Sequence, residues 1–157
     1  MPFETMLKEL AMTFFISMVP VIELRGAIPT GIAVGLPPAV TYFVAVAGNL
    51  VPVPFILLLI RRIFDWLRHT RKLGPIIQKL ERRAHLKGRM VKKYRVPGLI
   101  LLVGIPLPGT GAWTGSLVAS VFDMDLKKAS ISILLGIFLA AVIMTVVSYG
   151  LLGSVIS

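Results

Sequence analysis

The chain has 157 residues, of which 56% are hydrophobic and 15% charged, and its mean hydropathy is +0.88. These values lie far from those of an ordinary soluble domain and predict an all-α integral membrane protein with a single membrane domain, residues 1–157. The absence of cysteine excludes disulfides, thiolate nucleophiles and Cys-ligated metal sites.

The net charge of +10 is concentrated in one segment, because thirteen of the seventeen basic residues lie within 61–95. Such a run also occurs in nucleic-acid-binding proteins, but here long uncharged stretches flank it on both sides. We therefore expect this segment to contact anionic membrane lipids and no nucleic acid. The positive-inside rule places 61–95 in the cytoplasm and both termini outside the cytoplasmic membrane.

Residues 1–60 predict a helical hairpin followed by a membrane span. The apolar arms within 7–36 are each too short to cross a hydrocarbon core of about 30 Å, and the charged string ELR separates them. Broken backbone is tolerated at membrane depth only inside protein or beside a wet cavity, so we expect a re-entrant hairpin. The next stretch, 39–60, is long enough to span, and Pro52 and Pro54 predict a kink in it.

The second half repeats this order after the basic cytoplasmic loop, 61–95. Within the loop, Gly74-Pro75 and the helical spacing of the apolar residues that follow predict an amphipathic helix at the membrane interface. The stretch 96–122 again has short apolar arms around a break, and the uncharged stretch from Ala129 predicts an unbroken span. Hairpin and span thus occur in 1–60 and again in 96–157. This order predicts two inverted repeats, an architecture of membrane transporters.

Two charges, Glu23 and Arg25, stand at the tip of the first hairpin. Each would cost about 2.5 to 3.5 kcal/mol or more at membrane depth without a partner, which makes them functional candidates. Residues two apart do not share a helical face, so they either meet across a non-helical tip or find separate partners. The alternatives are a structural ion pair, or a shallow tip from which both side chains reach water.

The break in the second hairpin, PLPGTG at 106–111, comes directly before a helix predicted to start near Ala112. The free N–H groups and positive dipole end of this helix would bind a phosphate or carboxylate, with Thr110 and Thr114 adding hydroxyls. The alternative is a tight turn that serves only hairpin packing. Trp113 is interpreted as a gate or as an interfacial anchor. The predicted substrate-binding residues are Glu23, Arg25, Pro29, Thr30, Pro106, Pro108, Gly109, Thr110, Gly111, Trp113 and Thr114.

The strings ELRGAIP, 23–29, and PLPGTGAWTG, 106–115, resemble the small multidrug export family of bacterial and archaeal membrane proteins, a distant relative of the DedA and VTT-domain superfamily. The resemblance implies a DedA-like fold with two oppositely entering re-entrant hairpins, and movement of lipid-linked or amphipathic substrates across a membrane. By motif, Glu23 and Arg25 correspond to the charged first hairpin, and Pro106, Pro108 and Gly109 to the second tip. Many DedA proteins have a carboxylate at the position of Thr110, which leaves Glu23 as the acid able to carry a coupling proton.

Three functions follow as hypotheses. The first is a transporter or flippase for an anionic, polyprenyl-phosphate-like substrate, in which Arg25 and the helix start near Ala112 receive the head group and Glu23 orients Arg25 or carries a proton. The second is an exporter of cationic amphipathic compounds, in which Glu23 is the binding charge. The third is a non-transporting membrane scaffold. We expect no enzyme, cofactor or metal site, because no nucleophile, base and orienting group can be assembled. The small size predicts a homodimer.

Overall fold

The structure, a computed structural model, describes residues 2–156, and every regular element in this range is an α-helix. The all-α class predicted from the sequence is therefore confirmed for the described part of the chain. In chain order the helices are α1 (Phe3–Met18), α2 (Glu23–Ala33), α3 (Pro38–Leu50), α4 (Pro52–Arg68), α5 (Gly74–Lys87), α6 (Arg89–Gly104), α7 (Ala112–Val121) and α8 (Leu126–Ile156).

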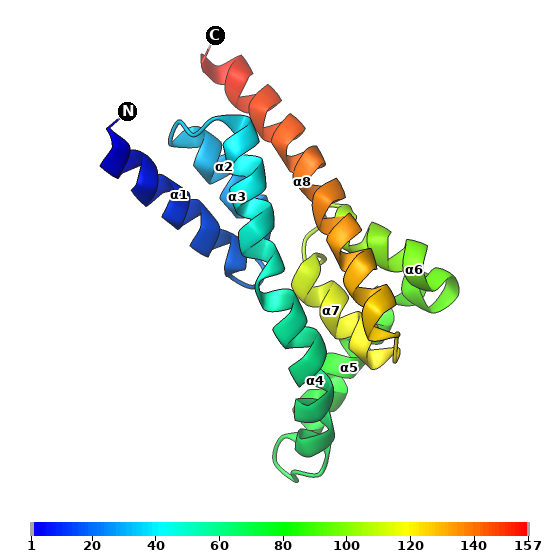
Figure 1. Ribbon diagram of the computed structural model, residues 1–157. Helices are drawn as coiled ribbons and strands as arrows, with labels where there is room; N and C mark the ends of the chain where they lie inside the picture. The colour runs from blue at the N-terminus through cyan, green and yellow to red at the C-terminus, as the bar shows by residue number, and fades with distance from the viewer. Residues whose placement is uncertain (1, 157) are drawn as a thin grey trace.

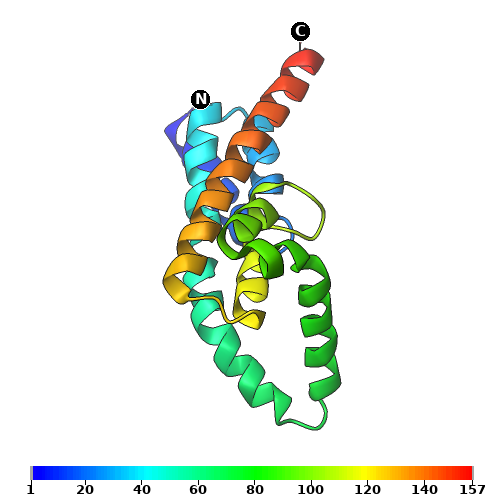
Figure 2. The same cartoon turned by 90° about the vertical axis from the view of Figure 1, so that its right-hand side faces the viewer.

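Two apolar rods run along most of the molecule and are long enough to cross a membrane (Figure 1). The first joins α3 and α4 over 30 residues, Pro38–Leu67, and the second is the 29-residue stretch Leu126–Ser154 of α8. Val51 keeps helical dihedral angles (φ −56°, ψ −48°), so the chain passes from α3 into α4 without a loop although Pro52 has no N–H to donate. The direction of the rod changes between α3 and α4 (Figure 2), where the sequence predicts a kink. The two spans expected from the sequence are both present as helices.

The other apolar helices form two hairpins. In the first, α1 and α2 are joined by residues 19–22, and in the second α6 and α7 are joined by residues 105–111. The α6 segment departs from helical geometry at Arg95 (φ 38°, ψ −96°), so its apolar part begins at Val96. This is the position where the sequence predicts that the basic loop ends and the second hairpin begins.

Close approach of helices requires small residues at defined positions. At Gly48 of α3, an added Cβ would overlap the main-chain oxygen of Phe14 in α1. At Gly136 of α8, it would overlap the side chain of Val103 in α6. Each hairpin therefore lies directly against the span that follows it, which is how small residues let helices approach where lipid gives no hydrophobic driving force.

The basic loop is mostly helical. The α4 helix continues to Arg68, and α5 begins at Gly74 with Pro75 in its first turn, as the sequence predicts. Figure 2 shows α5 rising from the far end of the molecule beside α7. The inner face of α5 buries Ile77 and Ala84 against neighbouring helices, among them α7. This amphipathic helix therefore packs against protein and does not rely on lipid alone to cover its apolar face.

Both termini lie at one end of the molecule, and the connection between α4 and α5 lies at the other (Figures 1 and 2). The core gathers around α8, whose Ile133 and Ile137 are fully buried, while large apolar side chains such as Phe15, Phe43 and Val146 remain more than half exposed on the outside. An apolar exterior of this kind is suited to lipid.

Candidate functional site

The tips of the two hairpins meet through Glu23. This residue is 2% exposed, and its carboxylate accepts hydrogen bonds from the main-chain N–H groups of Ala112, at 3.2 Å, and Trp113, at 3.0 Å. These N–H groups belong to the first turn of α7, where they have no partner within the helix and where the helix dipole favours a negative charge. Glu23 therefore caps a helix that begins 89 residues later in the chain.

The backbone of the first tip is constrained at this point. Glu23 has φ 50° and Val21 has φ 74°, both in the left-handed region that residues with a side chain rarely adopt. Such conformations cost roughly 1 to 3 kcal/mol each and persist where the surrounding structure fixes them. The two bonds to α7 are one source of this restraint on Glu23.

Arg25 reaches the same second tip by a different route. Its guanidinium donates to the main-chain oxygens of Leu107, at 2.7 Å, and Thr110, at 2.8 Å, and to the Thr110 hydroxyl, at 2.6 Å. Pro106 and Pro108 keep the 105–111 connection from forming a helix, and its Leu107 oxygen also accepts from the main-chain N–H of Thr110, at 3.2 Å, and from the Thr110 hydroxyl, at 2.8 Å. Glu23 and Arg25 thus have separate partners, which is one of the two arrangements that the sequence left open.

We call the group of Glu23, Arg25, Thr110, Ala112 and Trp113 the tip clasp. In it, two charged side chains of the first hairpin bind main-chain groups of the second. The carboxylate of Glu23 accepts from N–H groups, and the guanidinium of Arg25 donates to C=O groups. Bonds to ionised groups are about twice as strong as neutral ones and are each worth roughly 1.5 to 3 kcal/mol. The clasp is therefore a strong link between two hairpins that are far apart in sequence.

The remaining sequence-predicted residues divide into two groups. Gly109 and Thr114 lie beside the clasp, because the Gly109 oxygen accepts from the Thr114 hydroxyl at 3.1 Å, and Gly111 lies against Glu23. Pro29 and Thr30 are elsewhere, since they line a separate groove of about 590 Å³ with residues of α8. The structure does not bring these two residues to the tip clasp.

Two residues beside the clasp were missed by sequence reasoning. Asn49, 1% exposed at the end of α3, adjoins the Glu23 carboxylate. Lys87, the last residue of α5, donates to the Gly109 oxygen at 2.7 Å. An amide in an uncharged span was a signal for Asn49. No sequence signal pointed to Lys87, because it is one of many cations in its loop.

The carboxylate of Glu23 occupies the start of α7, where the sequence predicts that a substrate phosphate or carboxylate binds. An external anion could bind there only after Glu23 had left. No group of three or more metal-ligating side chains of the His, Cys, Asp and Glu types is found in the described residues.

Two apolar rods of membrane-spanning length, joined to two short hairpins in a chain with an apolar exterior, define a helical membrane protein. The chain belongs to the family described as "Putative small multi-drug export protein", whose model matches residues 23–143. The match begins at Glu23 and contains the whole tip clasp. Searches of curated proteins and of solved structures find no match to the chain. The relation to the DedA and VTT-domain superfamily stays a prediction.

Proposed function

We propose that this protein is a transporter that exports amphipathic cationic compounds across the cytoplasmic membrane, and that the tip clasp is its gate. The observation that carries the proposal is the reciprocal pairing of Glu23 with the start of α7 and of Arg25 with the 105–111 connection. Membership of a family that is described as multi-drug export proteins supports an export function as well.

The proposed arrangement in the membrane has two re-entrant hairpins that enter from opposite faces, as in a DedA-like inverted repeat. In support, α1 starts at the end of the molecule that carries both termini and stops near its middle, whereas α7 starts near the middle and stops towards the other end (Figure 1). The 61–95 loop, with its excess of basic residues, would face the cytoplasm and anionic lipid. Broken backbone at membrane depth would then be covered by protein, as it must be.

The gate opens when the Glu23 carboxylate is neutralised by a proton or by a cationic substrate. Neutralisation lowers the strength of its hydrogen bonds to Ala112 and Trp113 from that of charged bonds to roughly 0.5 to 1.5 kcal/mol each. It also removes the favourable interaction of the charge with the α7 dipole. The hairpins can then separate, and a path opens between them.

Glu23→Gln tests this role. The substitution keeps the size of the side chain and one acceptor but removes the exchangeable charge. Glutamine cannot regain the charge that closes the two tips, so the gate stays open and cannot complete a transport cycle. We therefore expect the flux of tetraphenylphosphonium through proteoliposomes to fall about tenfold or more, towards the rate of empty liposomes. Glu4→Gln, at an exposed position in the first turn of α1, is the matched control and should transport normally. Equal flux in wild type and Glu23→Gln would remove Glu23 from the mechanism.

A second candidate is the movement of an anionic, polyprenyl-phosphate-like lipid. The convergence of two cations, Arg25 and Lys87, on the 105–111 connection favours it. This route requires Glu23 to leave α7 so that the head group can take its place. Flux of a fluorescent polyprenyl phosphate in the same liposomes, lost in Arg25→Ala but kept in Glu23→Gln, would select this candidate. If neither compound moves faster than in empty liposomes, the scaffold function is favoured.

A further inference from the structure

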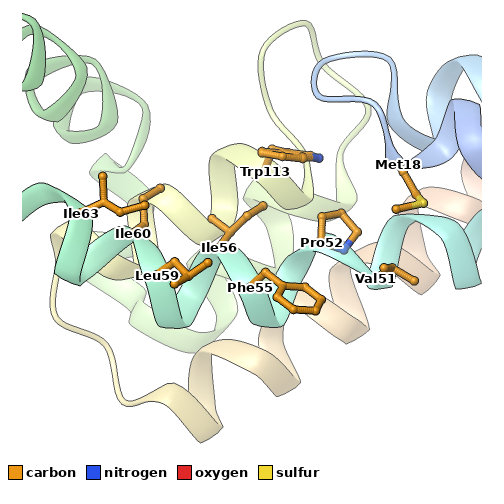
Figure 3. A pocket seen from close by; sticks show the side chains of 9 residues that line it. All are labelled: Met18, Val51, Pro52, Phe55, Ile56, Leu59, Ile60, Ile63 and Trp113. Atoms are coloured by element: carbon orange, nitrogen blue, oxygen red, sulfur yellow. The ribbon is translucent and has the colours of Figure 1, made fainter.

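An apolar groove of about 530 Å³ runs along α4 beside the tip clasp (Figure 3). It follows α4 from Val51 to Ile63, which is roughly 18 Å at 1.5 Å per residue. The Met18 side chain closes one end, at the end of α1, and the Trp113 indole lies over the middle. The residues that line it are Met18, Val51, Pro52, Phe55, Ile56, Leu59, Ile60, Ile63 and Trp113.

The groove opens to the outside of the protein. Phe55, Leu59 and Ile63 are 61%, 49% and 45% exposed, so in a bilayer they would face lipid. A molecule dissolved in the membrane could therefore enter sideways, without passing through water. The length and volume fit a long apolar chain or an extended hydrophobic body rather than a small polar solute.

One polar group in this groove has no partner. The Trp113 Nε1 atom is buried, yet it has no hydrogen-bond acceptor among the residues that the structure describes. Figure 3 shows this nitrogen on the side of the indole nearer to Met18 and Pro52. An unsatisfied buried donor costs about 1 to 3 kcal/mol, and a hydrocarbon chain cannot relieve that cost.

Trp113 also links the groove to the gate. Its main-chain N–H donates to Glu23 at 3.0 Å while its side chain lines the groove, so an occupant that moves the indole acts on a residue of the tip clasp. The indole face can in addition attract a quaternary ammonium group, and Glu23 supplies negative charge nearby. One residue therefore contacts both the expected apolar body and the expected polar end of a substrate.

We infer that this groove is the substrate-binding site, and that it prefers amphipathic cations with a hydrogen-bond acceptor near the charged end. This acceptor receives the Trp113 Nε1–H once the occupant has shifted the indole and uncovered the nitrogen. The inference rests on the proposed function and narrows its substrate class. A membrane lipid is the competing occupant, and its acyl chain would fill the groove without an acceptor at this place.

Direct binding tests the inference apart from transport. The chain has two tryptophans, and Trp66, 72% exposed on α4, can be replaced so that Trp66→Phe leaves Trp113 as the one fluorophore. In nanodiscs of brominated phosphatidylcholine, lipid chains in the groove quench Trp113. We expect palmitoylcholine, which has an ester carbonyl beside its ammonium group, to restore the emission saturably. Hexadecyltrimethylammonium lacks the carbonyl, so we expect it to require an about fivefold higher concentration for the same recovery of emission. This is the difference in affinity that one neutral hydrogen bond provides.

Variants separate the parts of the site. In radioligand binding, Trp113→Phe should weaken palmitoylcholine about fivefold more than hexadecyltrimethylammonium, since it removes the N–H and keeps an aromatic ring for the ammonium group that both ligands carry. Phe55→Ala, in the groove, should weaken both ligands. Phe43→Ala, at 65% exposure close to the 61% of Phe55 but outside the groove, should weaken neither.

Emission that neither ligand restores would mean that the groove holds lipid only, and would overturn the inference. Equal recovery by the two ligands would remove Trp113 Nε1 as a recognition group and overturn it as well. Binding as expected without flux of either ligand would leave the groove as a binding site and contradict the proposed transport. Flux without binding in the groove would support the proposed transport and contradict the groove as the substrate-binding site.

Discussion

Arg25→Ala is expected to reduce substrate flux about tenfold or more and to loosen the contact between the two hairpins. The guanidinium makes bonds of 2.6 to 2.8 Å to Leu107 and Thr110, and alanine leaves these acceptors without their charged partner at membrane depth. Flux in proteoliposomes and thermal unfolding in detergent should be measured on the same preparations.

Two further variants define the cause of this loss. Arg25→Lys retains the charge but cannot reproduce the planar fork that serves Leu107 and Thr110 together, so we expect partial recovery of flux. Arg62→Ala, at an exposed position of α4, controls for the loss of a positive charge. If Arg25→Ala kept its fold and transported at the wild-type rate, the guanidinium of Arg25 would not be needed for transport, and the prediction would be contradicted.

Gly111→Ala should have the largest effect on stability. Gly111 has φ 121° and ψ −170°, a conformation essentially restricted to glycine, and a Cβ there would overlap the Glu23 carboxylate. The backbone strain alone predicts a fall in unfolding temperature of roughly 5 °C or more. Flux should fall with it, because Glu23 would be pushed away from the first turn of α7.

The control for this substitution lies in α8. Gly150 lies inside α8, and an added Cβ would meet no atom within 4 Å. Gly150→Ala should therefore leave the unfolding temperature unchanged or raise it slightly, since alanine is favoured over glycine in a helix by up to about 1 kcal/mol. If Gly111→Ala unfolded at the temperature of Gly150→Ala, the geometry described for the second tip would be incorrect.

Most helical segments could be predicted because their signals are local. The uncharged stretch after Ala129 is long enough to span, Pro52 marks the junction of α3 and α4, and the glycine at 111 precedes the start of α7. Each of these inferences depends on chain length, a missing N–H or a free φ angle, which a single sequence displays directly.

The pairing between hairpins could not be predicted in the same way. The sequence indicated an acid in the first tip and an anion-binding helix start in the second, but these were separate expectations. Only the fold shows that Glu23 fills the site at Ala112, although 89 positions separate the two residues. Arg25, which was expected to receive a substrate head group, likewise has a partner within the chain, because its guanidinium donates hydrogen bonds to Thr110.

The positions of the residues around the tip clasp were even harder to predict from the sequence. Pro29 and Thr30 follow Glu23 and Arg25 closely in the chain, yet the turn of α2 directs them into the groove beside α8. Lys87 comes from a loop whose basic residues suggested lipid contact as a group, and the folding of α5 against α7 brings this one to Gly109. Such placements depend on the packing of distant helices rather than on local pattern.

The central claim is that the tip clasp is a gate which opens when Glu23 is neutralised, and the separation of the two tips tests it most directly. The chain has no native cysteine, so spin labels can be placed on Val21→Cys and Leu107→Cys, both at exposed positions, and their distance distribution measured by pulsed electron paramagnetic resonance. A second pair within the first hairpin, Phe3→Cys and Val21→Cys, reports on the hairpin itself and should stay constant. We predict a short, narrow distance between the tips without substrate, and a longer, broader one with tetraphenylphosphonium or in Glu23→Gln. Identical distributions in all three samples would contradict the claim.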